Sequence, residues 1–163
     1  ALCRPGTVIM SAVMDVRITK ADFDINAEHD ALKARAVGAI VTFTGTVRGD
    51  DDGAEITALT LEHFPGMTEA EITSIIETAS ERWSLAGVTV IHRVGRLLPE
   101  DNIVFVGVAA AHREAAFAGA SFIMDYLKTR APFWKKAEDA SGESWVEARV
   151  SDDLAADRWD ETD

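Results

Sequence analysis

The segment that most constrains the fold is NIVFVGVAAA, residues 102–111, which is apolar or small at almost every position. A short run of this kind, rich in β-branched residues and without polar alternation, is typical of a strand buried on both faces. We therefore expect this strand to be central in its sheet. Further strands are expected at the start of residues 16–25 and in residues 38–48, 55–64 and 87–97, with a closing pair in 132–138 and 144–150.

Helical periodicity marks two longer segments and a short one at residues 27–36. Residues 65–83 carry apolar side chains at steps of three and four, which predicts one core-facing stripe of Ile72, Ile75, Ile76, Ala79 and Trp83. Thr68 and Glu71 are spaced as a capping box at its start. The longest helix is expected from near His112 until Pro132 stops it. Helices and strands therefore mix without strict alternation, which favours the α+β class.

Length and composition indicate one globular domain. The chain has 163 residues, 47% hydrophobic and 27% charged, and lacks an apolar run near the roughly 20 residues that cross a bilayer. A formal net charge of -12 repels nucleic-acid backbones. We therefore expect a soluble protein that binds neither membrane nor nucleic acid. We also expect an N-terminal extension over residues 1–14, a single domain over 15–150 and an acidic, solvated tail over 151–163.

A single cysteine limits the redox chemistry that this chain can perform. Because Cys3 has no second cysteine to pair with, an intramolecular disulfide is excluded, which fits a reducing cytoplasm. Cys3 lies before Met10 and Met14, either of which is a candidate for the natural start.

Basic residues gather in the segment LKTRAPFWKKAE, residues 127–138, although the chain as a whole is acidic. Cations in the last turn of a helix are stabilised by its dipole by about 0.3–1 kcal/mol each, which accounts for Lys128 and Arg130. Lys135 and Lys136 lie beyond Pro132 and beside two aromatic residues, where the dipole does not act. From the residues alone, a solvated surface and an anion-binding site both remain open.

Other chemical motifs are missing from the sequence. It has no phosphate-loop or dinucleotide fingerprint, and its four histidines are scattered without the spacing of a zinc-binding helix. For each single histidine, a structural or surface role is the favoured interpretation. Arg48 ends a predicted strand before a glycine-rich loop, a position that is commonly just exposed.

Five segments in order and register resemble the large, catalytic subunit of molybdopterin synthase. They are FTGTVR (43–48), LTLEHFPGM (59–67), VIHRVG (90–95), AAAHREAAF (109–117) and MDYLKTRAPFWKK (124–136). The resemblance spans about residues 37–149. It implies an α/β hammerhead fold with an additional small antiparallel β-sheet subdomain. It also implies a cytoplasmic homodimer within a heterotetramer, with a small ubiquitin-like sulfur-carrier subunit at each end.

The reaction of this family adds two sulfurs to cyclic pyranopterin monophosphate and yields molybdopterin. The resemblance implies that sulfur arrives as a thiocarboxylate on the C-terminus of the small subunit, without a further cofactor or metal. The cysteine count agrees, because an enzyme that carries its own persulfide needs a cysteine in its site and this chain has Cys3 alone.

The resemblance also assigns site residues, position by position. Lys128 and Lys135 are the expected catalytic residues, acting in proton transfer and in charge neutralisation. The expected substrate contacts are Thr46, Val47, Arg48, His112, Arg113 and Lys136, and Arg149 is expected to contact the substrate or the partner's tail. One position departs from the family pattern: Ala137 stands where many members have glutamate, and the carboxylate follows at Glu138. In a strand this shift turns the carboxylate to the opposite face.

Two alternatives to the enzyme stay open. The first is a non-catalytic dimeric scaffold that binds a ubiquitin-like partner tail, although a scaffold has no need of two pocket lysines. The second is an unrelated anion-binding acyl- or phosphoryl-transferase, against which the missing phosphate loop and nucleophile count.

Overall fold

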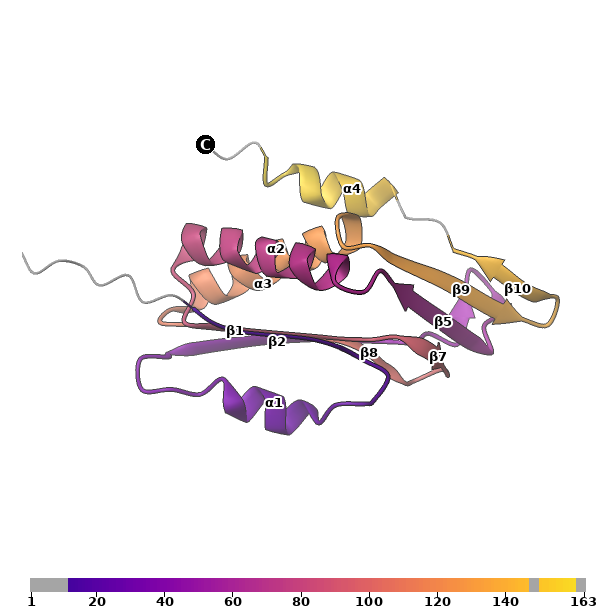
Figure 1. Ribbon diagram of the computed structural model, residues 1–163, viewed down its shortest axis with the longest axis horizontal. Helices are drawn as coiled ribbons and strands as arrows, with labels where there is room; N and C mark the ends of the chain where they lie inside the picture. Colours follow the sequence, from indigo (N-terminus) through magenta and orange to yellow (C-terminus); the bar gives the residue numbers. More distant parts are fainter. Residues whose placement is uncertain (1–11, 147–149, 161–163) are drawn as a thin grey trace, which may run out of the picture.

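The computed structural model describes residues 12–146 and 150–160 (Figure 1). Along the chain its elements are β1 (Val13–Thr19), α1 (Ile25–Ala31), β2 (Ala39–Thr46), β3 (Asp50–Asp51), β4 (Ala54–Glu55), β5 (Ala58–His63), α2 (Met67–Trp83), β6 (Gly87–Arg93), β7 (Gly95–Leu97), β8 (Asn102–Ala110), α3 (Arg113–Thr129), β9 (Phe133–Asp139), β10 (Gly142–Trp145) and α4 (Val150–Asp157). Among these residues, no helix combines the length and the apolar character needed to span a bilayer.

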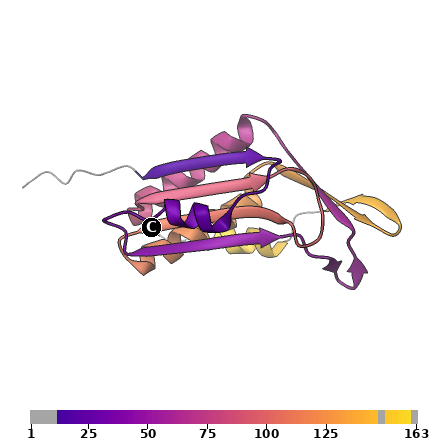
Figure 2. The same cartoon turned by 90° about the horizontal axis from the view of Figure 1, so that it is seen from below.

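The main sheet is four-stranded, in the order β1-β6-β8-β2, so β8 is an inner strand as its sequence predicts. Helices α2 and α3 cover one face of this sheet, and α1 lies on the other (Figures 1 and 2). Side chains alternate along β8: Val104, Val106 and Val108 join the core under the two long helices. Phe105 faces the other way, where it meets the ring of Phe23 edge-on. Burial on both faces explains why β8 lacks polar alternation.

A second, smaller sheet has the order β10-β9-β5-β7 and extends from one end of the main sheet (Figure 1). All its strand pairs are antiparallel. Its own small core consists of Val47, Leu61 and Leu97, with Leu59 and Ile103 packed against them. The structure therefore confirms the predicted α+β class with an additional small antiparallel sheet.

The start of α2 differs from the predicted capping box. The helix begins at Met67, after Gly66 with a φ of 83°, and the Glu69 carboxylate accepts the Gly66 N–H at 2.7 Å. Thr68 is buried, and its hydroxyl accepts the Phe64 N–H at 3.0 Å and donates to the Pro132 carbonyl at 3.1 Å. The prediction that Thr68 and Glu71 form the box was wrong: Thr68 lies inside the helix, and its hydroxyl ties the start of α2 to Pro132, the residue before β9.

The acidic C-terminal segment differs from the solvated tail that we expected. Residues 150–157 form α4, which packs on α3 and buries Ala156. Just beyond it, the Trp159 ring lies edge-on to Trp83 at 5.4 Å between centroids, and the Trp159 indole N–H donates to Asp125 at 2.7 Å. Apolar side chains among the acidic ones thus dock this segment on the helical layer. At the other end, Val13 and Met14 already belong to β1.

Candidate functional site

The predicted catalytic lysines lie where α3 ends and β9 begins. Lys128 is exposed in the last turn of α3, and the chain turns at Pro132 into β9. On β9, Lys135 is half-buried and stands opposite Leu61 of β5, which is 1% exposed. Because directly opposed residues of an antiparallel pair share a face, Lys135 lies on the inner, apolar face of the small sheet.

Lys136 occupies the other face of the same sheet, since consecutive residues of a strand point to opposite sides. Its Nζ lies 4.7 Å from the centroid of the Trp145 ring and 3.8 Å from the Glu143 carboxylate. Glu138 shares this outer face and accepts from the Arg96 guanidinium at 2.8 Å. The carboxylate of Glu138, which follows one residue later than in the family pattern, therefore lies on the face opposite Lys135, as strand geometry predicts.

A buried histidine that we did not single out from the sequence lies among these groups. The ring of His92 on β6 stacks on Phe133, with centroids 3.8 Å apart and an angle of 17° between the planes. Its Nδ1 is 2.8 Å from the Arg93 carbonyl, so the neutral ring donates from Nδ1. The pKa of His92 is lowered to about 4, chiefly because burial disfavours the charged ring. The hydrogen bond to the Arg93 carbonyl acts against this shift, whereas the charges of Lys135, Lys128 and His63 add to it. His92 is therefore neutral at pH 7.

His63 completes the surroundings of His92. It pairs with Phe133 across β5 and β9, and its Nε2 is 3.6 Å from a Glu69 carboxylate oxygen. From the sequence we favoured a structural role for both histidines, because neither has a second histidine at the spacing of a zinc-binding helix. The signal that pointed to them was their place in the segments LTLEHFPGM and VIHRVG, on which the resemblance rests.

The predicted contact segment Thr46–Arg48 lies at the same end of the molecule as the two lysines. β2 ends at Thr46, and the buried side chain of Val47 packs with Leu61, the residue opposite Lys135. Thr46 and Arg48 are exposed, and the Arg48 guanidinium is 3.6 Å from Asp51. The small core therefore connects this segment to the strand that carries Lys135.

His112 and Arg113 lie at the opposite end of α3. His112 is the N-cap of this 17-residue helix and both residues are exposed. At 1.5 Å per residue, about 24 Å separates them from Lys128. One chain therefore does not bring all the predicted contacts together. Arg149 lies outside the described residues.

The chemistry available at the lysine end is anion binding and proton transfer. The positive charges of Lys128 and Lys135 both act on His92, so this end of the molecule attracts anions, and an ammonium group can donate a proton. Within residues 12–146 and 150–160, no three His, Cys, Asp or Glu side chains gather closely enough to hold a metal ion.

Comparisons with known proteins identify the family to which this chain is similar. Residues 18–130 match the model of a family described as MoaE protein. A Yersinia pestis protein named molybdopterin synthase catalytic subunit is 57% identical over 145 residues, which cover 88% of this chain and 96% of that protein. Among solved structures, the molybdopterin biosynthesis MoaE protein from Burkholderia ambifaria superposes with a TM-score of 0.78 at 49% identity, covering 92% of this chain and all of that one. A molybdopterin synthase from Staphylococcus aureus gives 0.75 at 26% identity, covering 80% and 95%.

Proposed function

This chain belongs to the MoaE protein family, and on that premise we propose that it is the catalytic subunit of a molybdopterin synthase. It works in the cytoplasm as a sulfurtransferase that converts cyclic pyranopterin monophosphate into molybdopterin. The sulfur comes from the thiocarboxylated C-terminus of a small ubiquitin-like subunit. The observation that supports this proposal best is the half-buried Lys135 on an apolar face, close to Lys128 and the neutral His92.

The lysines have distinct tasks in this proposal. In each transfer the thiocarboxylate sulfur forms a C–S bond at a side-chain carbon of the pterin while a C–O bond at that carbon breaks. The departing oxygen leaves on the phosphate when the cyclic phosphate opens, or as water. A further water then cleaves the acyl–sulfur bond and leaves a carboxylate on the carrier. Lys128 is exposed at a helix end, where the carrier tail can reach it, and it moves protons during this attack. Lys135 neutralises the negative charge that develops when the cyclic phosphate opens, in a setting where burial strengthens the interaction.

The complete site requires two copies of the chain. A single small pterin does not reach from Lys128 to His112 across the length of α3. A two-fold dimer solves this, because His112 and Arg113 of one protomer then meet Lys128 and Lys135 of its partner.

Reconstitution tests the proposed function. The purified chain, a thiocarboxylated small subunit and cyclic pyranopterin monophosphate are combined, and molybdopterin is measured. We expect product that carries two sulfurs and depends on the chain. If no product forms where a known synthase works, the chain is not this enzyme. A chain that binds the carrier tail and gives no product would instead be the non-catalytic scaffold.

A further inference from the structure

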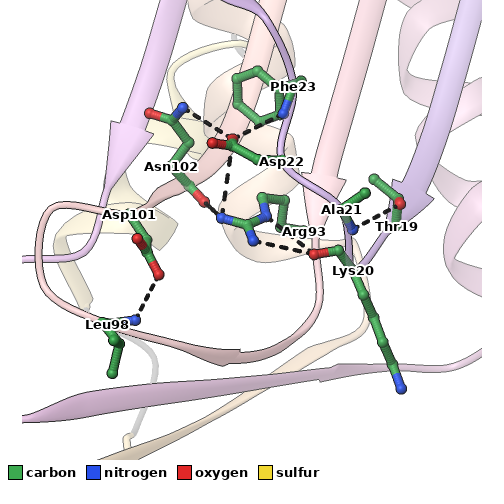
Figure 3. Close-up of polar contacts among 9 residues, drawn as sticks. All are labelled: Thr19, Lys20, Ala21, Asp22, Phe23, Arg93, Leu98, Asp101 and Asn102. Carbon is green, nitrogen blue, oxygen red and sulfur yellow. Dashed lines mark hydrogen bonds and ion pairs between the residues drawn. The ribbon is translucent and has the colours of Figure 1, made fainter.

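The four residues between β7 and β8 form a tight turn, Leu98 to Asp101 (Figure 3). The Asp101 N–H donates to the Leu98 carbonyl at 3.0 Å, and the Asp101 carboxylate accepts the Leu98 N–H at 2.8 Å. Pro99 suits the second position of such a turn. Glu100 in the third position has a φ of 75°, a left-handed conformation that is uncommon for a residue with a Cβ. Two hydrogen bonds between Leu98 and Asp101 therefore close the turn, and Glu100 is held in an unfavourable backbone conformation.

This turn holds both backbone polar groups of Val47. The Glu100 N–H donates to the Val47 carbonyl at 2.9 Å, and the Val47 N–H donates to the Asp101 carbonyl at 2.9 Å. Val47, itself an expected substrate contact, stands between two others, Thr46 and Arg48. It follows the point where the pairing of β2 with β8 shifts register, between Gly45 and Thr46. After this shift only Thr46 still pairs with β8, at Asn102, and the turn then supports the next residue, Val47.

The turn is itself anchored to the main sheet (Figure 3). At Asn102, directly after the turn, the backbone carbonyl accepts from Arg93 Nη1 at 3.0 Å and the side-chain amide donates to Asp22 at 3.1 Å. The same guanidinium donates to the Lys20 carbonyl through Nε at 3.3 Å and Nη2 at 3.1 Å. The connection between β1 and α1 is thereby fixed to the start of β8. These bonds hold Asn102, the residue that directly follows the turn, in its place.

We propose that Asp101 is a positioning residue for the substrate. The Asp101 side chain closes the turn, and the closed turn fixes the Val47 backbone. The Val47 backbone in turn sets the positions of Thr46 and Arg48 in the anion site. This inference rests on the proposed function, because the substrate is the phosphate-bearing pterin that Thr46 and Arg48 contact. The buried Val47 side chain also packs on Leu61, opposite Lys135, so the turn sets the contact segment relative to the catalytic strand.

Steady-state kinetics of the reconstituted synthase test this role. Asp101→Ala leaves the Leu98 N–H without its acceptor and loosens the turn. We expect KM for cyclic pyranopterin monophosphate to rise about tenfold with a smaller change in kcat, since small misplacements of positioning groups cost this much or more. Asp101→Asn keeps an oxygen acceptor and should restore most of the affinity. Asp139→Ala is the matched control, because the Asp139 carboxylate accepts the Ser141 N–H at 2.8 Å in the β9–β10 turn, away from Val47.

Amide hydrogen exchange gives a second readout that does not depend on catalysis. In Asp101→Ala the Val47 and Glu100 amides should exchange faster than in the wild type, whereas in Asp139→Ala they should not. Unchanged exchange in Asp101→Ala would overturn the role of Asp101 in holding Val47. Faster exchange with an unchanged KM would overturn its role in substrate positioning. If the wild type itself forms no molybdopterin, the proposed function fails, and the exchange data still decide whether Asp101 holds Val47.

Discussion

The buried imidazole of His92 makes the stability of the fold depend on pH in a defined direction. Its pKa falls from 6.5 to about 4 in the folded chain, chiefly because burial disfavours the charged ring. In the folded state the ring stays neutral between these values, whereas in the unfolded chain it takes up a proton. At about 1.4 kcal/mol per pKa unit, acidification from pH 6.5 to about 4 therefore costs about 3 kcal/mol of unfolding free energy through this group.

Urea denaturation of the wild type and of His92→Gln over this pH range measures the effect. Carboxylates titrate near the acidic end in both proteins, so the difference between their unfolding free energies isolates the histidine. We expect this difference to change by about 3 kcal/mol, with the wild type losing more stability as the pH falls. Parallel pH profiles would refute the reasoning.

In Lys135→Met the pKa of His92, followed by NMR, should rise, because a neighbouring positive charge is gone.

Two further predictions concern the assembled enzyme. A chain with both His112→Ala and Arg113→Ala is mixed with a Lys128→Ala chain. About a quarter of wild-type activity should return, since half of the dimers then hold one intact site of two. If subunit exchange is proven and no activity returns, the shared site is contradicted. Cys3→Ser should keep full sulfur transfer in the reconstituted assay, because in the proposed reaction the small subunit supplies the sulfur. A large loss would indicate a persulfide on this chain.

Much of the fold could be predicted from local patterns. The run at residues 102–111 indicated an inner strand, and β8 is one because both of its faces are covered. The apolar stripe of residues 65–83 indicated the helix that became α2, and four of its five members are fully buried. Pro132 marked the limit of α3, whose last helical residue is Thr129. These features depend on spacing within one element, which a sequence displays directly.

Features that depend on contacts between distant segments could not be predicted in this way. The sequence places Lys135 and Lys136 side by side, and the pairing of β9 with Leu61 decides that Lys135 faces the apolar side. His92 shows no sign of its neighbours in its own segment, because Phe133 and the lysines come from α3 and β9. The helix α4 was hidden by its acidic composition, since its stability comes from docking on α3.

The measurement that tests the account most directly compares lysines on the two faces of β9. In the reconstituted synthase, Lys135→Ala and Lys128→Ala should lower turnover by about 10²–10⁴ while the dimer stays folded, because each removes a group that handles charge or protons in the reaction. Lys136→Ala is the comparison variant. The resemblance makes Lys136 a substrate contact, but its ammonium lies against Trp145 on the outer face, so we expect a much smaller loss of turnover than at position 135. Near-normal turnover of Lys135→Ala, or equal losses at positions 135 and 136, would contradict a catalytic site on the inner face.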